Sequence, residues 1–264
     1  MRALRSALFS LFLVVLTIPY AIACFIAFPF MGAHRRYWMV TGWCRTVLLA
    51  LRVLCGVRYR VDGRHNLPRG PVVLLSKHQS AWETLAFPAI MPTPLCYVFK
   101  RELLRVPFFG WALGMLKMIH IDRKRGGPRA FLSVIKQGRE RLADGSWVVM
   151  FPEGTRTPVG RSGLYKSGGA RFAIEVGAPV VPIALNAGHC WPRNSFVKHP
   201  GEIVVSIGPA IDSTGLDSET LNRRVADWIE AEMRRIDAPA YRDETPPDAA
   251  SGTAAARDEA DLAA

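Results

Sequence analysis

The stretch WVVMFPEGTRT, at residues 147–157, joins an apolar segment to a polar turn. Trp147 to Met150 are apolar and partly β-branched, which is typical of a buried strand. Pro152 and Gly154 then interrupt the strand, and Gly154 allows the backbone to turn or to approach a ligand closely. The polar side chains that follow stand past the carboxyl end of a strand, where α/β proteins place their sites. The stretch therefore predicts an α/β protein with a candidate site here.

Three polar side chains of this turn can bind a ligand. Thr155 offers a hydroxyl, and Arg156 offers a planar group that fits phosphate or carboxylate. Glu153 can hold Arg156, a neighbouring loop or a substrate hydroxyl. The alternative is a surface turn with a solvated arginine.

Short β-branched segments recur along the chain and alternate with helical stretches. One helix is predicted from Pro128 to Gly145, a second over Arg171 to Val176, and a longer one over Ser218 to Ile236. The alternation predicts α/β layers around a largely buried sheet. The predicted strands are Arg58–Val61, Val72–Leu75, Cys96–Phe99, Met118–Ile121, Trp147–Phe151, Val180–Leu185 and Glu202–Ile207.

His78 and Glu83 follow one of these strands, Val72 to Leu75, where the chain enters a turn or a helix. In a regular helix, side chains five residues apart would point about 140° apart. The two can meet only if His78 precedes the helix and Glu83 lies in its first turn. The carboxylate would then fix one imidazole nitrogen and leave the other to accept a proton from a hydroxyl. A structural histidine at a strand end is the alternative.

Two further features lie at predicted strands. Lys100 and Arg101 follow the strand Cys96 to Phe99 and form a second candidate site for an anion. Pro182, within Val180 to Leu185, predicts an edge strand or a bulge.

The amino-terminal region predicts membrane association. Residues 6–33 carry no formal charge and are long enough to span a bilayer as a helix. Trp38 to Val57 is also apolar but contains Arg45 and Arg52 near one helical face, which favours an interfacial helix. The first segment is expected to span the membrane, or the pair to form a hairpin that enters one leaflet and returns. A cleaved signal peptide and a buried core helix are the alternatives.

Composition and charge limit the class of protein. The chain has 264 residues, half of them apolar, and a net charge of +12, which excludes a disordered or collagen-like chain. From Asp237 onward, seven acidic and two basic residues give −5, which leaves +17 for residues 1–236. That excess suits an anionic membrane, a phosphorylated substrate or nucleic acid. The five cysteines form no C-x-x-C pair, which favours a reducing environment and indicates neither zinc site nor disulfide framework.

Four blocks, taken in this order, resemble the glycerolipid acyltransferase family and in particular its bacterial 1-acyl-sn-glycerol-3-phosphate acyltransferases. They are His78 to Glu83, Lys100 to Gly110, Phe151 to Thr157 and Val180 to Ile183. The third block is very specific, because a string such as FPEGTR is expected by chance on the order of once in a hundred thousand chains of this size. The resemblance implies a central mixed sheet flanked by helices, with an N-terminal membrane-associated hairpin.

The resemblance also implies the roles of single residues. His78 would be the general base, with Glu83 in the position of its acidic partner. Glu83 stands where the family has Asp, and Lys77 stands where Asn is frequent, yet we expect activity to be retained. The residues implied for substrate binding are Lys100, Arg101, Glu153, Gly154, Thr155 and Arg156.

The implied reaction is acyl transfer from acyl-ACP or acyl-CoA to the sn-2 hydroxyl of lysophosphatidic acid, giving phosphatidic acid. It needs no metal and no cofactor besides the acyl thioester co-substrate. The implied partners are the membrane phospholipid surface, a lysophospholipid acceptor and the thioester donor, with no nucleic acid. The implied location is the cytoplasmic face of the inner membrane. Another lysolipid acceptor, such as a lyso-ornithine lipid, and a non-catalytic basic membrane adaptor are the alternatives.

Three regions are therefore expected. Residues 1–57 would form the membrane-associated helical segment, and residues 58–236 the acyltransferase domain, with the motifs in residues 70–190. Residues 237–264 would form a disordered acidic tail, because they lack apolar periodicity.

Overall fold

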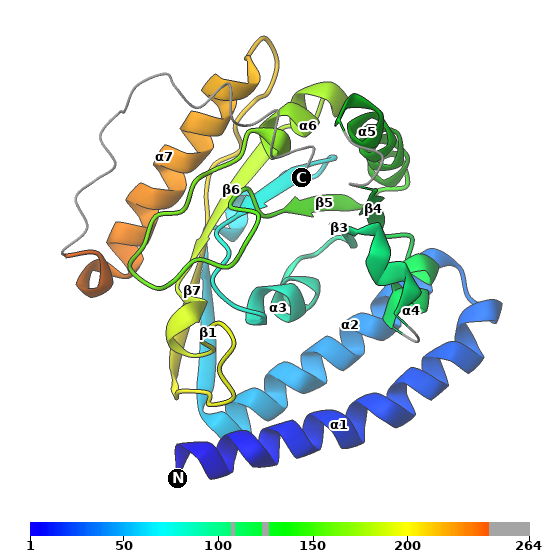
Figure 1. The fold of residues 1–264 in the computed structure, drawn as a ribbon, viewed down its shortest axis with the longest axis vertical. Helices are drawn as coiled ribbons and strands as arrows, with labels where there is room; N and C mark the ends of the chain where they lie inside the picture. Colours follow the sequence, from blue (N-terminus) through cyan, green and yellow to red (C-terminus); the bar gives the residue numbers. More distant parts are fainter. Residues whose placement is uncertain (107–108, 123–126, 243–264) are drawn as a thin grey trace.

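A mixed seven-stranded sheet stands at the centre of the computed structural model, which describes residues 1–106, 109–122 and 127–242 (Figure 1). The strands are β1 Val57–Asp62, β2 Val73–Ser76, β3 Leu95–Lys100, β4 Ile119–Ile121, β5 Trp147–Met150, β6 Val180–Leu185 and β7 Gly201–Ile207. The α-helices of the described residues are α1 Arg2–Ala27, α2 Ala33–Ala50, α3 Trp82–Ile90, α4 Phe109–Met115, α5 Gly127–Ala143, α6 Gly168–Val176 and α7 Ser218–Ile236. The α/β class and all seven predicted strands are confirmed, with each strand end within one residue of its predicted position.

The strand order across the sheet is β1-β7-β6-β2-β5-β3-β4. Neighbouring strands run parallel except for β6 and β7, which are antiparallel. The central strands β2 and β5 pair in parallel, with Leu75 opposite Met150. The carboxyl ends of β2 and β5 therefore lie side by side, and the segments that follow them begin at the same edge of the sheet.

Two layers of helices cover the two faces of this sheet (Figure 1). Side chains alternate between the faces along each strand, because the strand period is two. In β2, Leu74 packs with the side chains of α1, α2 and α3, whereas Val73 and Leu75 pack with those of α5, α6 and α7. The helices begin and end at local signals: Asp217 accepts a hydrogen bond from Thr220 N at the start of α7, and Gly177 ends α6 at a φ of 68°.

Pro182 does not mark an edge strand, because β6 lies inside the sheet between β2 and β7. The carbonyl of Pro182 accepts a hydrogen bond from Gly208 N at 2.9 Å, and the antiparallel pairing with β7 covers the residues from Ile183 to Leu185. Beyond Pro182 the antiparallel pairing resumes between Val180 and Ile211 with a register shift of one residue, so Pro182, which lacks an N–H donor, lies beside a bulge in this pairing.

Helices α1 and α2 form a hairpin along one side of the molecule (Figure 1). The hydroxyl of Tyr20 donates to Met39 O at 2.6 Å, and Trp43 Nε1 donates to Thr17 Oγ1 at 3.2 Å. Both helices are long and apolar enough to cross a membrane by length and composition. One face of α2 packs on α3 and the sheet, so the hairpin is joined to the α/β domain along this face.

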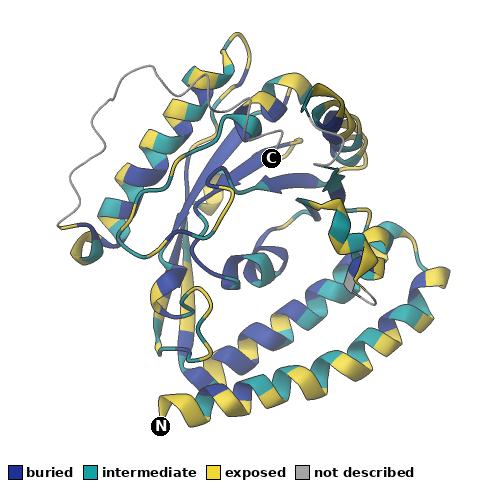
Figure 2. Ribbon diagram, in the orientation of Figure 1, coloured by how far each residue is buried: buried dark blue, intermediate teal, exposed yellow. Residues whose placement is uncertain are grey.

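The outer side of α1 is apolar and exposed (Figure 2). Its exposed side chains recur every three or four residues, so that they form one stripe along the helix. Such a stripe is far larger than the scattered exposed apolar residues of soluble surfaces and marks an interaction face. The residues of this outer stripe are Leu4, Leu8, Leu11, Val15, Ile18, Ile22 and Ile26.

The structured region continues past the end of α7. Asp237 and Tyr241 are both buried, and a 3₁₀ turn covers Ala238–Tyr241. The sequence placed the start of a disordered tail at Asp237, so the structure moves this boundary to beyond Tyr241. The sequence did not show this, because one buried ring, that of Tyr241, produces no apolar periodicity. Residues 243–264 of the expected tail lie outside the described residues.

Candidate active site

The candidate site lies at the carboxyl edge of the sheet. His78 follows β2, and Phe151 to Thr157 follow the neighbouring strand β5. On the other side of β2, the segment after β6 contributes Gly188, whose N–H donates to Gln79 Oε1 at 3.1 Å. Three neighbouring strands therefore place their following segments around His78.

His78 and Glu83 meet in the way that the sequence required. His78 precedes α3, which begins at Trp82, and Glu83 lies in the first turn of that helix. The distance from His78 Nδ1 to Glu83 Oε1 is 2.8 Å. The Glu83 side chain is fully buried, whereas 14 % of the His78 side chain is exposed, so the ring can be reached from solvent.

Glu83 also fixes the backbone that carries His78. Its Oε1 atom accepts hydrogen bonds from Gln79 N at 2.9 Å and from Ser80 N at 2.7 Å. Three hydrogen-bond donors therefore converge on this one oxygen. Glu83 Oε1 accepts a hydrogen bond from the Nδ1–H of His78, which leaves Nε2 as the nitrogen that can take up a proton.

The imidazole of His78 packs against an aromatic ring. The ring of Phe151 lies 4.0 Å from it, centroid to centroid, at an interplanar angle of 20°. Tyr97 stacks on Phe151 with a centroid distance of 6.3 Å. Phe151 opens the FPEGTRT block, so this block contributes to the orientation of the histidine as well as to the neighbouring turn.

Glu153 is buried beneath the histidine. Its Oε2 atom accepts a hydrogen bond from His78 N at 2.8 Å, and its Oε1 atom lies 2.8 Å from Lys77 Nζ and 3.1 Å from Thr157 Oγ1. Burial raises the pKa of Glu153, and the neighbouring Lys77 ammonium opposes that rise. The sequence placed Glu153 among the substrate-binding residues, but its side chain is 1 % exposed and contacts other residues of the chain.

The rest of this turn faces outward. Gly154 has a φ of 67°, a conformation that favours glycine, and both Gly154 and Thr155 are exposed. Arg156 is partly exposed, and its carbonyl accepts a hydrogen bond from Arg193 at 2.8 Å. The turn therefore presents a hydroxyl and a guanidinium at the surface while its backbone is held in place.

Lys100 and Arg101 leave the same sheet edge at the end of β3, and both side chains are exposed. Arg101 forms an ion pair with Asp122. In the described part of the chain, no hydrogen bond or ion pair connects Lys100 or Arg101 to His78. Arg101 borders a cleft of about 470 Å³, which is lined by Arg101, His120, Asp122, Arg129, Ala130 and Ser133.

The structure adds residues that the motifs did not identify. Thr157 donates its N–H to the His78 carbonyl at 2.8 Å, and its hydroxyl lies 3.2 Å from that carbonyl and 3.1 Å from Glu153 Oε1. Lys77, which stands where the resembled family frequently has Asn, is fully buried next to Glu153. Lysine is rarely fully buried unless it is paired, so a lysine directly after a buried strand was the available signal. Among the described residues, no three His, Cys, Asp or Glu side chains converge as metal ligands do.

Comparisons with known proteins place this geometry in context. A family model described as Acyltransferase matches residues 58–186. A 1-acyl-sn-glycerol-3-phosphate acyltransferase of Pseudomonas aeruginosa is 44 % identical over 240 residues, which cover 89 % of this chain and 92 % of that protein. The human 1-acyl-sn-glycerol-3-phosphate acyltransferase alpha is 32 % identical over 177 residues, which cover 65 % of this chain and 61 % of that protein.

A solved structure has the same fold. The crystal structure of the 1-acyl-sn-glycerophosphate acyltransferase from Thermotoga maritima matches with a TM-score of 0.71. The match covers 90 % of this chain and 98 % of that chain at 23 % identity. At this identity the likeness concerns the fold alone.

Proposed function

Because this chain belongs to the 1-acyl-sn-glycerol-3-phosphate acyltransferase family, we propose that it transfers an acyl group to the sn-2 hydroxyl of lysophosphatidic acid and so forms phosphatidic acid. The observation that carries the proposal is the contact of 2.8 Å between His78 Nδ1 and the buried Glu83, next to the outward-facing turn at Thr155 and Arg156. A histidine held in this way is suited to take a proton from an alcohol.

The reaction proceeds by proton transfer at His78. Nε2 of His78 removes the proton of the acceptor hydroxyl, and the oxygen attacks the carbonyl carbon of the thioester. The carbon–sulfur bond of the thioester then breaks, and the new carbon–oxygen bond is kept as the ester. The imidazolium returns its proton to the sulfur, so that a free thiol leaves and His78 is regenerated. Glu83 stabilises the transient imidazolium.

We assign acceptor binding to the exposed groups around this histidine. Thr155 and Arg156 supply a hydroxyl and a guanidinium, which suit the phosphate of lysophosphatidic acid. Lys100 and Arg101 supply further positive charge along the same sheet edge. Gly154 provides the turn, and the buried Glu153 holds that turn and the histidine backbone from inside.

We propose acyl-ACP or acyl-CoA as the donor. Both present the acyl chain as a thioester, whose thiol is a good leaving group, so the reaction needs no cofactor beyond this co-substrate. Five free and buried cysteines are consistent with a reducing compartment, in which these donors would reach the site. The proposed location is therefore the cytoplasmic face of the cell membrane, without a nucleic-acid partner.

The proposed membrane contact is the exposed apolar stripe of α1. Such a helix can lie in the interface with its apolar face among the lipid chains. Both open ends of the hairpin meet, because Arg5 Nε donates to Leu54 O at 2.5 Å. This contact supports a hairpin over residues 1–57 whose two ends stay on one side of the membrane, beside an acyltransferase domain of residues 58–236.

An assay of thiol release tests the proposed reaction. Detergent-solubilised protein is incubated with lysophosphatidic acid and either acyl-ACP or acyl-CoA, and both free thiol and phosphatidic acid are measured. Formation of both products in equal amounts is the expected result. A lyso-ornithine lipid and a second lysophospholipid serve as alternative acceptors. If the enzyme acylates either of them faster than lysophosphatidic acid, that lipid replaces lysophosphatidic acid as the proposed acceptor. If the protein binds lipid but acylates none of these acceptors, the result would favour the non-catalytic membrane adaptor.

A further inference from the structure

Lys77 and Glu230 form an ion pair between two distant parts of the chain. Lys77 directly follows β2, and Glu230 lies on α7. Lys77 Nζ is 2.7 Å from Glu230 Oε1, and the two side chains are 0 % and 8 % exposed. Helix α7 lies beyond residues 58–186, the range that the family model matches. The pair is therefore not part of the four sequence blocks.

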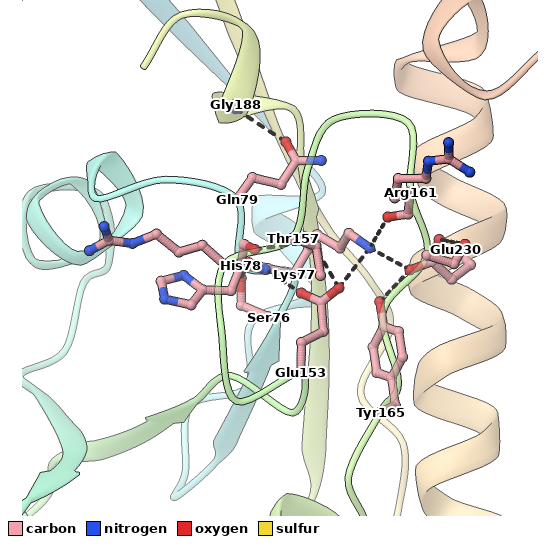
Figure 3. Close-up of polar contacts among 12 residues, drawn as sticks. Ser76, Lys77, His78, Gln79, Glu153, Thr157, Arg161, Tyr165, Gly188 and Glu230 are labelled. Carbon is pink, nitrogen blue, oxygen red and sulfur yellow. Dashed lines mark hydrogen bonds and ion pairs between the residues drawn. The ribbon is translucent and has the colours of Figure 1, made fainter. Parts of the chain in front are cut away.

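Further hydrogen bonds surround this pair (Figure 3). Tyr165 donates its hydroxyl to Glu230 Oε1 at 2.6 Å, and Ser162 donates its hydroxyl to Glu230 Oε2 at 2.8 Å. Lys77 Nζ also donates to the Arg161 carbonyl at 3.1 Å. Both ions thus have partners for most of their hydrogen-bonding capacity, which is the condition under which buried charges are tolerated.

Lys77 connects this cluster to the candidate active site. The same Nζ atom lies 2.8 Å from Glu153 Oε1, while Glu153 Oε2 accepts the His78 N–H at 2.8 Å. Figure 3 shows Lys77 between Glu230 and Glu153, with the His78 imidazole directed away from the ion pairs. The side chain of Lys77 is therefore connected to the His78 N–H through a single carboxylate.

We propose that Lys77, anchored on α7 by Glu230, is a positioning residue for His78 and acts by keeping Glu153 an ionised acceptor of the His78 N–H and the Thr157 hydroxyl. The inference rests on the proposed acyl transfer. It assigns a catalytic purpose to an ion pair whose net contribution to stability alone is expected to be small, because desolvation offsets attraction in buried pairs.

The charges around Glu153 determine the direction of the expected effects. Lys77 stabilises its ionised form, whereas burial opposes ionisation and raises the pKa of Glu153. Removing the ammonium must raise that pKa further. The titratable or charged residues near Glu153 on the packed elements are Lys77, His78, Arg161, Tyr165, Lys166 and Glu230.

The first experiment compares kcat against pH for the wild type and Lys77→Met. Methionine keeps an unbranched apolar stem but removes the charge. We expect kcat at pH 7 to fall about tenfold or more, with the acceptor KM within about twofold, because Lys77 does not contact the acceptor. Since Glu153 then ionises at higher pH, the acidic limb of the kcat profile should move upward by about one pH unit or more.

The second variant, Glu230→Gln, tests the proposal in the opposite direction. Gln keeps the size of the side chain and an acceptor oxygen for Lys77 Nζ, so the anchor on α7 is kept, but it removes a negative charge that draws the ammonium away from Glu153. The acidic limb should therefore stay in place or move to lower pH. A merely structural ion pair predicts the same direction in both variants, since both variants lose the pair. An upward shift in Glu230→Gln, or an unchanged profile in Lys77→Met, would overturn the proposal.

Lys136→Met is the matched control, because Lys136 is exposed on α5, and its profile should equal that of the wild type. If Lys77→Met does not fold, Lys77→Gln is measured in its place. The direction in which the acidic limb of kcat moves in Glu230→Gln still distinguishes the positioning role from a merely structural ion pair. A double variant, Lys77→Met with Glu153→Gln, should cost little more than Glu153→Gln alone, because Lys77 acts through Glu153. Additive losses would contradict that route.

Hydrogen exchange separates this inference from the proposed reaction. In Lys77→Met, the His78 amide should exchange about tenfold faster, while the Gln79 and Ser80 amides, which donate to Glu83, should keep their rates. This readout requires no substrate. Absence of thiol release by the wild type would refute the proposed function, whereas an unchanged His78 exchange rate would refute the positioning role.

Discussion

His78 Nδ1 and Glu83 Oε1 lie 2.8 Å apart, although a regular helix would direct the two side chains to different faces. The contact exists because α3 begins at Trp82, so that His78 lies in the preceding turn and the carboxylate reaches back to it. Glu83 also holds Gln79 N and Ser80 N. The acidic residue therefore fixes both the ring and the backbone of the histidine.

Replacing either member of this pair should reduce turnover. His78→Ala removes the proposed base and is expected to lower kcat by about 10²- to 10⁴-fold. Glu83→Gln keeps the size of the side chain but removes the charge that supports the imidazolium, so kcat should fall at least tenfold with a smaller change in KM. Thiol release is measured, with His65→Ala as a control because His65 is exposed on another turn. Full activity of His78→Ala would contradict the mechanism.

Arg156→Ala should weaken binding of a phosphorylated acceptor. The loss of one charge-assisted contact corresponds to an increase of about 10- to 100-fold in the KM for lysophosphatidic acid. The KM for the thioester donor should change less, since the donor does not depend on that phosphate contact. Arg58→Ala, at an exposed position on the edge strand β1, is the matched control. Equal effects of Arg156→Ala on both KM values would indicate a general distortion of the turn.

Charged residues in the outer stripe of α1 should weaken membrane binding. Val15 and Ile18 are 62 % and 58 % exposed, and burying each in lipid is worth about 1.5–3 kcal/mol. The double variant Val15→Asp with Ile18→Asp is therefore expected to reduce partition into anionic vesicles by tenfold or more, measured by flotation. Leu132→Asp, at an equally exposed site on α5, should have no such effect. Unchanged flotation of the double variant would exclude the stripe as the membrane contact.

His189 and Asp237 should make stability depend on pH. His189 Nε2 lies 2.8 Å from Asp237 Oδ2, and this hydrogen bond raises the pKa of His189. A raised pKa stabilises the fold fully below the ordinary histidine value of about 6.5, and the stabilisation is lost as pH rises through the folded-state pKa. The free energy of unfolding of the wild type should therefore exceed that of His189→Asn by more near pH 5.5 than near pH 8.5.

The size of that effect should be modest. The His189 side chain is 48 % exposed, so solvent screens the pair, and we expect a difference of at most about 1 kcal/mol in the free energy of unfolding. Urea denaturation at several pH values measures it. A difference between the two proteins that grows as pH rises would have the wrong sign and would exclude the assigned pair.

Much of the fold was predictable because its signals are local. β-branched segments marked all seven strands, and α7 was predicted with its observed bounds from apolar spacing. The condition for contact between His78 and Glu83 was also derived from helix periodicity, and the start of α3 meets it. For Pro182 the edge-strand alternative was wrong, because β6 lies between β2 and β7, whereas the bulge alternative agrees with the one-residue register shift beside it.

The sequence by itself determined the class of fold, the apolar N-terminal helices and the residues His78 and Glu83, because strand patterns, apolar runs and short motifs are properties of neighbouring residues. Only the tertiary structure decided that Glu153 lies inside the site and that Lys77 contacts Glu230, which is 153 positions away. A buried ion pair requires each charge to meet its partner where water is excluded. That condition depends on how α7 packs against the sheet, and no local pattern in the sequence records it.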